Sequence, residues 1–574
     1  MSADMPEANP AAAAANDAPV VADAPVVADA QVVADAPPEV RWTTRDRVLR
    51  AALVLLPPLI VAAFVIVNVA PGLMPGVGFW DTGEFQTVLP ILGTAHPTGY
   101  PTYVLIGFIA NILLTPFGEP AFRINLLSLL AVAFAAGATV ALMRRLIDST
   151  PIAMATGLGL SLTPVVWANA TRADPHPIHL AFVALLLLVL VTWEQKRRAR
   201  APDADRWLVA AALVFGLSAA NHSLTLLLAP PIGLYVLATE PRIVLRPRLL
   251  ALCALALIGS AAAVYMELPI RAGLIRAPLV YAHPETWDGF WYIALAEQFR
   301  GSLSDVFGNL PHKLGQVGQL AWNQFGFLTP LLVPAFLATV RTAPRFALLT
   351  GSAMVITLLF NLSYANADID RYYLGPVLWA WTWVGILAAF VFRLVVAWIP
   401  GAEARAGDEA RAGDREPGIG PRRAPVLSLA NALAVIASIA ILIPGINAMS
   451  LSRIQADRSN DTRAARWLAD AMPLFQPNAI VVSWWSTSTT LWYGQKIEGL
   501  RPDVFIVDDR TMLDLNLGGA SAVIARYLGH QPVYLIRANG RDLALVLKDY
   551  DLKQLLGNGS DALYEVVGRK VASG

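Results

Sequence analysis

Two carboxylates and a histidine follow the first long apolar run of the chain. Asp81 and Glu84 stand in the stretch Phe79-Trp-Asp-Thr-Gly-Glu84, and His96 stands in Ala95-His-Pro-Thr-Gly-Tyr-Pro101. At this spacing the two carboxylates share one face if the segment is helical. A carboxylate beside a membrane can accept the proton of a hydroxyl group, and a neighbouring histidine can orient it. These three residues are therefore candidates for a catalytic site.

A structural role for Asp81 is the competing hypothesis. Asp81-Thr-Gly-Glu84 also matches a helix N-cap followed by an acidic first turn, and such caps are common. The spacing alone does not decide between the two. The turn from His96 to Pro101 favours the catalytic hypothesis, because a cap has no use for a proline-stiffened turn beside it.

The composition assigns the chain to the membrane. Of its 574 residues, 56% are hydrophobic and 15% are charged, whereas an average soluble domain is about 25% charged. The 43 basic and 42 acidic residues nearly cancel, which argues against nucleic acid as a partner. The single cysteine, Cys253, excludes an intramolecular disulfide. There is no Walker loop and no His-Glu-x-x-His motif, so neither ATP hydrolysis nor the simplest zinc protease is expected.

The length of each apolar segment predicts the membrane crossings, and the basic residues in the loops predict their direction. A crossing helix needs about 20 apolar residues, and Lys and Arg collect on the cytoplasmic side. Four arginines at residues 41–50 precede the first span, which places the N-terminus in the cytoplasm and Asp81 outside. Residues 100–117 are interrupted by prolines and are expected to lie in the outer interface or to re-enter. About eleven crossings are predicted, at residues 41–70, 124–143, 151–168, 178–193, 207–220, 225–238, 249–266, 325–340, 346–362, 374–398 and 426–448.

The predicted fold is mostly α-helical and polytopic. Residues 1–40 repeat Val-Val-Ala-Asp units without an aromatic residue and are predicted to form a disordered cytoplasmic tail. Residues 41–449 are predicted to form the membrane domain. Its outer loops lie at 71–123 and 267–324, and a charged cytoplasmic linker lies at 399–425.

A small α/β domain is predicted after the last span, at residues 450–574 on the outer side. Short β-rich runs at 479–482, 503–507 and 532–536 alternate with helical stretches such as 462–472. This alternation is typical of a layered α/β domain.

Further polar residues at the outer loop junctions are candidates for substrate binding. Charged groups near lipid are energetically costly, and those that are present usually serve a function. The guanidinium fork binds phosphate oxygens in a bidentate way, so Arg271 and Arg371 are candidates for a lipid phosphate. Alternatively, these arginines only snorkel to the headgroups. The substrate-binding candidates are His96, Tyr100, Asn125, Arg172, Asp174, Asn221, His222, Arg271 and Arg371.

Two of these segments also have simpler interpretations. His176 and His179 stand one turn apart, but Pro175 and Pro177 are expected to interrupt that helix, so a metal site is the weaker hypothesis. For Asn221-His222, a polar hairpin between two helices is slightly favoured over a substrate contact.

The motifs together resemble a known family of multi-span proteins. The two stretches around Asp81 and His96, then Asn125 with Ser128, Gly216-Leu-Ser, Asn221-His222, Leu268-Pro-Ile-Arg271, Tyr493-Gly-Gln and Gly499-Leu-Arg-Pro-Asp-Val504, follow in the order of that family. The family includes the protein O-mannosyltransferase acting on IPT/TIG domains and was long described only as a domain of unknown function. The Asp-Thr-Gly-Glu and His-Pro-x-Gly-Tyr-Pro motifs are the most specific part.

The resemblance implies a GT-C glycosyltransferase fold and a sugar donor carried on a polyprenyl phosphate. It implies transfer of a hexose such as mannose to a protein or glycan hydroxyl on the outer face, so membrane lipid, donor and acceptor are the expected partners. The chain departs from the family at Ala173-Asp174-Pro-His176, where Ala-Glu-x-Tyr is usual. It departs again at Tyr281-Ala-His283-Pro, where Asn-Trp-Gly-Asp-Pro is usual, which leaves the role of that loop open.

Under this hypothesis each candidate has a role. Asp81 is the base, Glu84 is its partner or a binder of sugar hydroxyls, and His96 orients the site. Arg271 and Arg371 bind the donor phosphate. No metal ligand is assigned and no cofactor beyond the donor is certain, while a divalent metal remains an open alternative.

Two other functions remain as alternatives. A transporter or flippase for a lipid-linked sugar is expected to carry polar residues near the middle of the membrane and an internal repeat. A non-catalytic glycan-binding membrane protein is expected to use the aromatic residues Trp484-Trp485 and Trp492-Tyr493, although such runs are more often core. In each case we expect a multi-pass protein of a bacterial plasma membrane with its C-terminal domain outside.

Overall fold

The computed structural model of the chain describes residues 44–365, 368–398, 429–536 and 540–570. The predicted tail at 1–40 and the predicted linker at 399–425 lie outside these residues. Residues 52–574 form one unit by their internal contacts.

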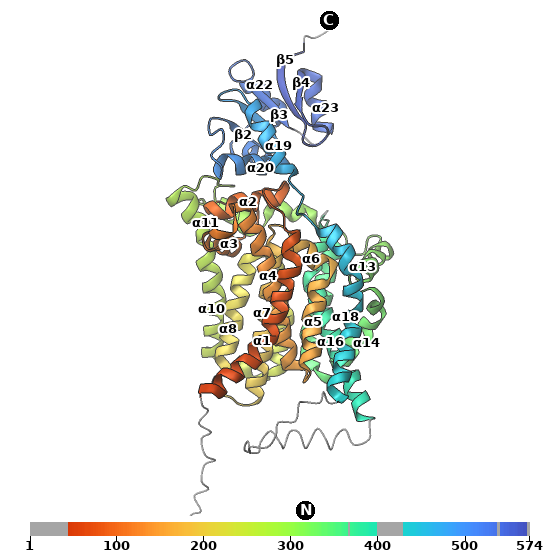
Figure 1. The fold of residues 1–574 in the computed structure, drawn as a ribbon. Helices are drawn as coiled ribbons and strands as arrows, with labels where there is room; N and C mark the ends of the chain where they lie inside the picture. The colour runs from red at the N-terminus through yellow and green to blue at the C-terminus, as the bar shows by residue number, and fades with distance from the viewer. Residues whose placement is uncertain (1–43, 366–367, 399–428, 537–539, 571–574) are drawn as a thin grey trace, which may run out of the picture. The chain divides into compact units, whose positions relative to one another are not determined.

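In the described part of the chain, eight helical segments are long and apolar enough to cross a membrane. A ninth is obtained if α5 (Thr150–Leu162) and α6 (Pro164–Ala170), bent by 66° at their junction, form one span. Pro164 explains the break, because a proline starts a helix but cannot donate a hydrogen bond within one. The eight segments overlap with α1 (Thr44–Val69), α4 (Pro120–Leu146), α7 (Pro175–Arg198), α10 (Pro247–Tyr265), α13 (Leu310–Phe325) with α14 (Leu332–Thr342), α15 (Pro344–Ser363), α16 (Leu374–Ala397) and α18 (Leu429–Ala456) (Figure 1).

The predicted total of eleven crossings is not confirmed. The difference lies in the pair predicted at 207–220 and 225–238, which corresponds to α8 (Ala204–Asn221) and to η3 (Ser223–Leu228) with α9 (Ala229–Thr239). α8 carries Asp205 and Arg206 in its first turn, and residues 223–239 form a short apolar helix. Both fall short of the about 20 apolar residues that a crossing helix needs.

The segment after the first carboxylates is also short. α3 (Pro101–Leu113) has 13 residues, which corresponds to about 20 Å of helix. This length agrees with the prediction that residues 100–117 do not cross the membrane.

Glycines allow the helices of the membrane domain to approach closely. α4 packs against α5 and α7, and α8 packs against α7 and α10. A Cβ atom at Gly157 of α5 would lie 2.7 Å from the carbonyl oxygen of Ala136 in α4, and one at Gly216 of α8 would lie 2.3 Å from the carbonyl oxygen of Leu257 in α10. Larger residues there would push the helices apart, because small side chains are what permit such close backbone contacts.

The C-terminal domain, residues 457–570, contains a five-stranded sheet with the order β2-β1-β3-β5-β4. β1 (Ile480–Ser483) pairs in parallel with β2 (Phe505–Val507) and with β3 (Val533–Ile536). These three strands match the predicted β-rich runs, and α19 (Arg463–Ala471) matches the predicted helix.

Two antiparallel strands were not predicted. β4 (Tyr550–Leu556) and β5 (Leu563–Arg569) form a hairpin that joins the sheet through β5 and β3. Most of their side chains are exposed or partly buried, so they carry charged residues such as Lys553 and Glu565 and lack the continuous apolar runs of the inner strands.

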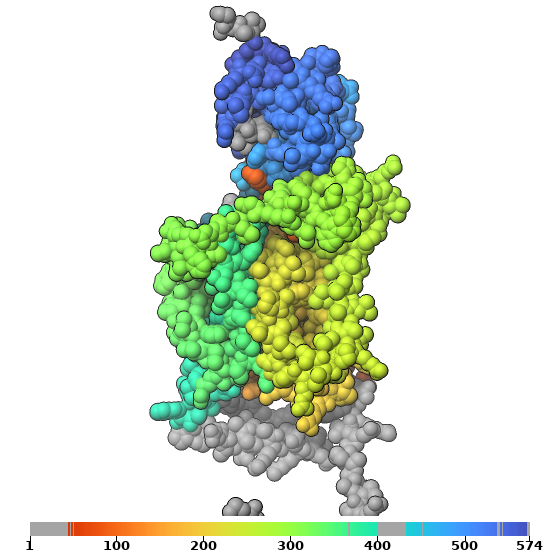
Figure 2. Space-filling model, turned by 180° about the vertical axis from the view of Figure 1, so that it is seen from behind, coloured from red at the N-terminus to blue at the C-terminus, as the bar shows by residue number. Residues whose placement is uncertain are grey.

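The carboxyl ends of β1 and β2 lie beside the membrane domain. β1 leads into α20 (Trp485–Lys496), and β2 leads into α21 (Asp509–Asp514). α20 packs against α2 (Trp80–Ile91), as Figure 1 shows. In Figure 2 the yellow-green segment that follows α10 lies between the blue C-terminal domain and the helices, and the backbone N–H of Thr94 donates to Leu279 of that segment at 3.0 Å.

Candidate active site

Helix α2 carries the two carboxylates in its first turns. Phe79 is the N-cap residue, in extended conformation and without a side-chain cap bond. Asp81 and Glu84 therefore lie within the helix, and Asp81 is not its cap. The loop before α2 is hydrogen-bonded to the helix: the backbone N–H of Gly78 donates to the side-chain oxygen of Gln86 at 2.8 Å.

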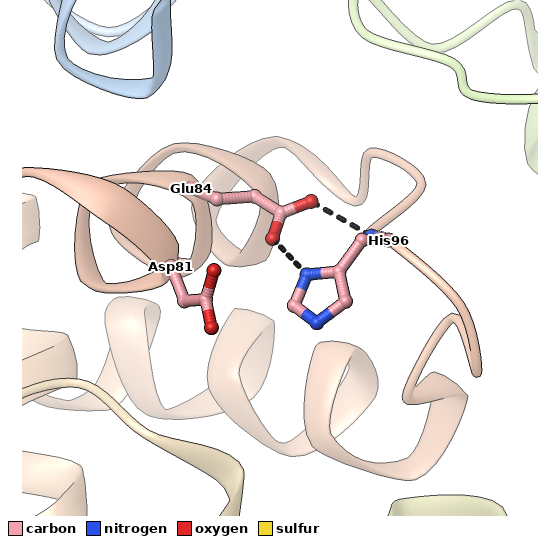
Figure 3. A group of neighbouring side chains, drawn as sticks. All are labelled: Asp81, Glu84 and His96. Atoms are coloured by element: carbon pink, nitrogen blue, oxygen red, sulfur yellow. Dashed lines mark hydrogen bonds and ion pairs between the residues drawn. The ribbon is translucent and has the colours of Figure 1, made fainter. Parts of the chain in front are cut away.

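Glu84 and His96 form a buried pair (Figure 3). Glu84 is fully buried, and one of its carboxylate oxygens accepts the backbone N–H of His96 at 2.7 Å. The other oxygen is hydrogen-bonded to Nδ1 of the same imidazole, and Nε2 lies 3.1 Å from the hydroxyl oxygen of Tyr100. Burial lowers the pKa of His96, but the charges of Glu84 and Asp81 outweigh it and raise this pKa above 6.5. The imidazole is therefore stabilised in its charged form.

Asp81 lies beside this pair and remains reachable. Its Oδ1 accepts the indole N–H of Trp485 at 3.0 Å, and its Oδ2 accepts from Nη2 of Arg371 at 3.4 Å. Its side chain is 31% exposed, and in Figure 3 its carboxylate lies next to the imidazole of His96. Burial opposes ionisation, but His96 and Arg371 together lower the pKa of Asp81 below 3.8. Asp81 is thus a charged carboxylate that a substrate can reach.

A second carboxylate and histidine meet at the start of α7. Asp174 is the N-cap residue, and its Oδ1 accepts from the backbone N–H of His176 at 2.8 Å and from Nδ1 of His176 at 2.6 Å. Its Oδ2 accepts from Nη1 of Arg371 at 3.0 Å. The expectation that Pro175 and Pro177 interrupt this helix is wrong: they stand in its first turn, where a missing N–H costs nothing.

A cavity of about 590 Å³ collects several predicted site residues. Among them, Asp81, His96, Tyr100, His222 and Arg371 line it. The ring centroids of His222 and Tyr100 lie 5.6 Å apart. The membrane domain also contributes lining residues that were not predicted to bind substrate, among them Phe85, His176, Tyr364 and Tyr372.

Six predicted site residues do not line this cavity. Glu84 and Asp174 lie behind the wall, where they hold His96, His176 and Arg371 through the bonds described above. The other four are Asn125, Arg172, Asn221 and Arg271.

Three of those four bind backbone or side-chain groups that shape the site. Asn125 is buried, accepts from the backbone N–H of Ala173 at 2.8 Å and donates to the carbonyl of Met74 at 2.8 Å. Asn221 donates to the carbonyl of Pro175 at 3.2 Å. Arg271 donates from Nε and Nη2 to the carbonyls of Leu92 and Ile91, at 3.0 Å and 2.8 Å. Its fork thus binds the carboxyl end of α2.

The C-terminal domain supplies a further wall of the cavity, which the motifs did not indicate. Trp484 and Trp485 follow β1, Asp508 to Arg510 follow β2, and all of them line the cavity. In open α/β sheets, ligands bind beyond the carboxyl ends of parallel strands. The predicted runs at 479–482 and 503–507 therefore contained a usable signal, because they end just before these residues.

One group in the described part of the chain brings three potential metal ligands together. Ligand atoms of Asp81, Glu84 and His96 lie within 4.8 Å of one another. As arranged, however, the oxygens of both carboxylates already accept hydrogen bonds, and Arg371 and Arg510 approach Asp81 and Glu84 at 3.4 Å and 3.3 Å. A divalent cation bound at this group would have to compete with Arg371 and Arg510 for the carboxylate oxygens.

A family of known proteins matches the part of the chain that begins at Asp81. Residues 81–244, which contain α2, α4, α7 and α8, match the model of a family described as the N-terminal domain of the protein O-mannosyl-transferase TMEM260. The mouse protein of that name is 28% identical over 468 residues, which are 77% of this chain and 60% of the mouse protein. The chain therefore spans less than two thirds of the length of this relative.

Solved structures show the same fold at low sequence identity. ArnT from Cupriavidus metallidurans bound to undecaprenyl phosphate is 16% identical, with a TM-score of 0.50 over 93% of this chain and 99% of that one. The oligosaccharyltransferase of Archaeoglobus fulgidus in its apo form is 14% identical, with a TM-score of 0.52 over 90% of this chain and 74% of that one. The chain thus has a GT-C fold with a small C-terminal sheet domain, and its resemblance to the protein O-mannosyltransferase family is confirmed.

Proposed function

We propose that the chain is a membrane glycosyltransferase that moves a sugar, such as a hexose, from a polyprenyl-phosphate-linked donor to a hydroxyl group of a protein or glycan. The observation that carries this proposal is Asp81, a carboxylate of lowered pKa that opens on a cavity of about 590 Å³. The named relative is an O-mannosyltransferase, and the structural relative was solved with undecaprenyl phosphate.

In the proposed reaction Asp81 accepts the proton of the acceptor hydroxyl. The acceptor oxygen forms a bond to the anomeric carbon while the bond from that carbon to the phosphate oxygen breaks. The electron pair of the broken bond leaves with the polyprenyl phosphate. Charge therefore develops on the phosphate, and we assign Arg371, one of the arginines at the cavity wall, to stabilising it.

The surroundings refine the roles of the other candidates. Glu84 is fully buried and does not line the cavity, so we assign it to holding His96 rather than to binding sugar hydroxyls. His96, Tyr100 and His222 line the cavity and are assigned to substrate binding. Arg271 is assigned to holding the end of α2, since two of its donors bind carbonyls there.

The proposed orientation follows the basic loops. Asp81 and the C-terminal domain lie on the outer side of a bacterial plasma membrane, and the N-terminus lies in the cytoplasm. A donor whose lipid tail stays in the membrane then reaches the cavity from the membrane side, and the acceptor arrives from outside.

Gene deletion and complementation test the proposal. The deletion strain is complemented with the wild type, with Asp81→Asn, or with Asp551→Asn as a control at an exposed position of β4. Mass spectrometry of envelope proteins and glycans is expected to find a hexose restored by the wild type and by the control, but not by Asp81→Asn. A flippase would instead change the distribution of the lipid-linked sugar without transfer, and a glycan-binding protein would change neither.

A further inference from the structure

The C-terminal domain contacts both carboxylates of α2. The indole N–H of Trp485 donates to Asp81 at 3.0 Å, and Nη1 of Arg510 lies 3.3 Å from Glu84. Trp485 begins α20, directly after β1, and Arg510 lies in α21, directly after β2. The two contacts thus come from the ends of two neighbouring parallel strands.

Several hydrogen bonds hold this domain in place on α2 and its neighbours. Thr490 donates to the carbonyl of Gly78 at 3.0 Å, and the backbone N–H of Ala121 donates to the hydroxyl of Tyr493 at 3.2 Å. These bonds join α20 to the loop before α2 and to the start of α4. The position of Trp485 relative to Asp81 is thus set by the packing of α20 on α2.

Arg510 is held by aromatic rings on several sides. The centre of its guanidinium lies 3.1 Å from the ring centroid of Tyr281, 4.6 Å from that of Trp485 and 5.7 Å from that of Trp492. A guanidinium stacks favourably on such rings. The side chain is mostly buried, and Arg510 lines both the cavity beside Asp81 and a second cavity of about 370 Å³ on the other side. The planar group therefore has little freedom to leave Glu84.

Tyr281 lies in the loop that precedes α12 (Trp287–Ala294). The backbone N–H of Ala282 donates to the carboxylate of Asp514 in α21 at 3.1 Å, which ties the same loop to the C-terminal domain. The guanidinium of Arg510 is thus packed between a ring of this loop, that of Tyr281, and rings of the C-terminal domain, among them that of Trp485.

We propose that Trp485 and Arg510 are positioning residues of the glycosyltransferase site, so that the C-terminal domain is a working part of the catalytic centre and not a separate binding module. This inference rests on the proposed function. Trp485 acts through Asp81, by directing one carboxylate oxygen and stabilising its charged form. Arg510 acts through Glu84 and the imidazole that Glu84 holds.

The contact from Trp485 leaves Asp81 able to act. A carboxylate has about four lone-pair positions, and the hydrogen bonds from Trp485 and Arg371 occupy two of them. Because both donors favour the charged form, Asp81 stays deprotonated while a free lone pair remains for the acceptor hydroxyl.

Trp485→Phe tests the first contact, because it keeps an aromatic ring and removes only the indole N–H. Besides Trp485, the charged groups beside Asp81 are His96, Arg371, Asp174 and Glu84, and the substitution leaves them unchanged. Loss of the hydrogen bond raises the pKa of Asp81, so the acid limb of the turnover profile is expected to move to higher pH. Turnover at the optimum is expected to fall about tenfold, as for a lost hydrogen bond to a charged group.

Trp467→Phe is the matched control. Trp467 lies in the same domain and donates its indole N–H at 2.9 Å to the backbone carbonyl of Asp561, which does not line the cavity. Its loss is expected to affect stability but not the acid limb.

Arg510→Lys tests the second contact, with Arg526→Lys as its control. Lysine keeps the charge but cannot stack as a planar group or hold its place between the rings. Arg526 also lies over a tyrosine ring of the same domain, at 5.8 Å from Tyr527, and does not line the cavity. We expect a fall of about tenfold in turnover for Arg510→Lys and none for Arg526→Lys.

The assay uses the full chain in nanodiscs with a polyprenyl-phosphate hexose and the envelope fraction of the deletion strain as acceptor. Variants are compared per folded protein, measured by size exclusion. If the wild type transfers sugar and both variants behave as their controls do, the positioning role is overturned while the proposed function stands. If the wild type itself transfers no sugar, the proposed function fails and the inference fails with it.

Discussion

The guanidinium of Arg371 joins Asp81 and Asp174, which belong to helices far apart in the sequence. Nη1 lies 3.0 Å from Asp174, and Nη2 lies 3.4 Å from Asp81. Asp174 is also hydrogen-bonded to His176. Arg371 therefore forms ion pairs both with the proposed base and with the N-cap residue of α7. A single cation thus connects the two carboxylates at the wall of the cavity.

Replacement of this arginine by lysine tests the connection. One ammonium group cannot occupy both positions of the fork, so Arg371→Lys is expected to lose one of the two contacts. Turnover with saturating donor and acceptor is expected to fall by about tenfold or more. Arg123→Lys is a suitable control, because Arg123 donates to Gly118 and Asn111 and does not line the cavity. Equal turnover for Arg371→Lys and the wild type would contradict the role.

The pH dependence of turnover follows from two shifted groups. Asp81 must be charged to act as a base, and its pKa lies below 3.8, so activity is expected to fall only in acid below that value. His96 has a pKa raised above 6.5, and its protonated form donates from both ring nitrogens, so turnover is expected to fall as the pH rises through this pKa. His96→Gln is expected to remove the alkaline limb and to move the acid limb to higher pH, because the positive charge of His96 helps to lower the pKa of Asp81. Persistence of the alkaline limb in that variant would assign it to another group.

Much of the site was predictable because the relevant signals are local. The spacing of Asp81 and Glu84 predicted one helical face, and the structure places both in the first turns of α2. The turn at His96 was predicted to lie beside them, and His96 does bind Glu84. Proline and polar residue types mark such loops in the sequence itself.

The contribution of the C-terminal domain was not predicted because it depends on contacts between distant segments. Trp485 is 404 positions from Asp81, and Arg510 is 426 positions from Glu84. Neither residue belongs to a spaced motif, and a tryptophan pair is more often part of a core. The parallel pairing of β1 and β2 brings their following loops to one edge. The predicted strand ends indicate such an edge, but they do not show that it faces Asp81 and Glu84.

The start of α7 shows a different kind of error. The sequence predicts that the two prolines around His176 break the helix, whereas they occupy the first turn of a 24-residue helix. Proline is tolerated there, because the first N–H groups have no partner within the helix. The same two prolines therefore fit either a break within a helix or the first turn of one, and the residue at which the helix starts decides between these predictions.

The orientation of the membrane domain is tested with reporter fusions. A reporter fused after Arg145, Arg200, Arg248 or Arg345 is expected to be cytoplasmic, and one fused after Gly574 is expected to be exported. An exported signal after Arg145 would mean that residues 100–117 cross the membrane. The 13 residues of α3 make that outcome unexpected, because about 20 apolar residues are needed.

Arg271 offers a choice between two roles that one substitution separates. If it bound the donor phosphate, Arg271→Lys would keep the charge but lose the bidentate fork, and the KM for the donor would rise more than that for the acceptor. In the structure the fork instead binds the carbonyls of Ile91 and Leu92 at the end of α2. We therefore expect Arg271→Lys to lower the melting temperature and to reduce turnover modestly, with an unchanged KM for the donor.

The measurement is a donor titration at saturating acceptor, paired with a thermal melt of the same preparation. Arg345→Lys is the control, because Arg345 also donates to a backbone carbonyl, that of Ala238 at 2.9 Å, and does not line the cavity. A selective rise in the KM for the donor, with a melting temperature equal to that of the wild type, would restore Arg271 to the phosphate site. Its contact with α2 would then be secondary, and Arg371 would share the phosphate with it.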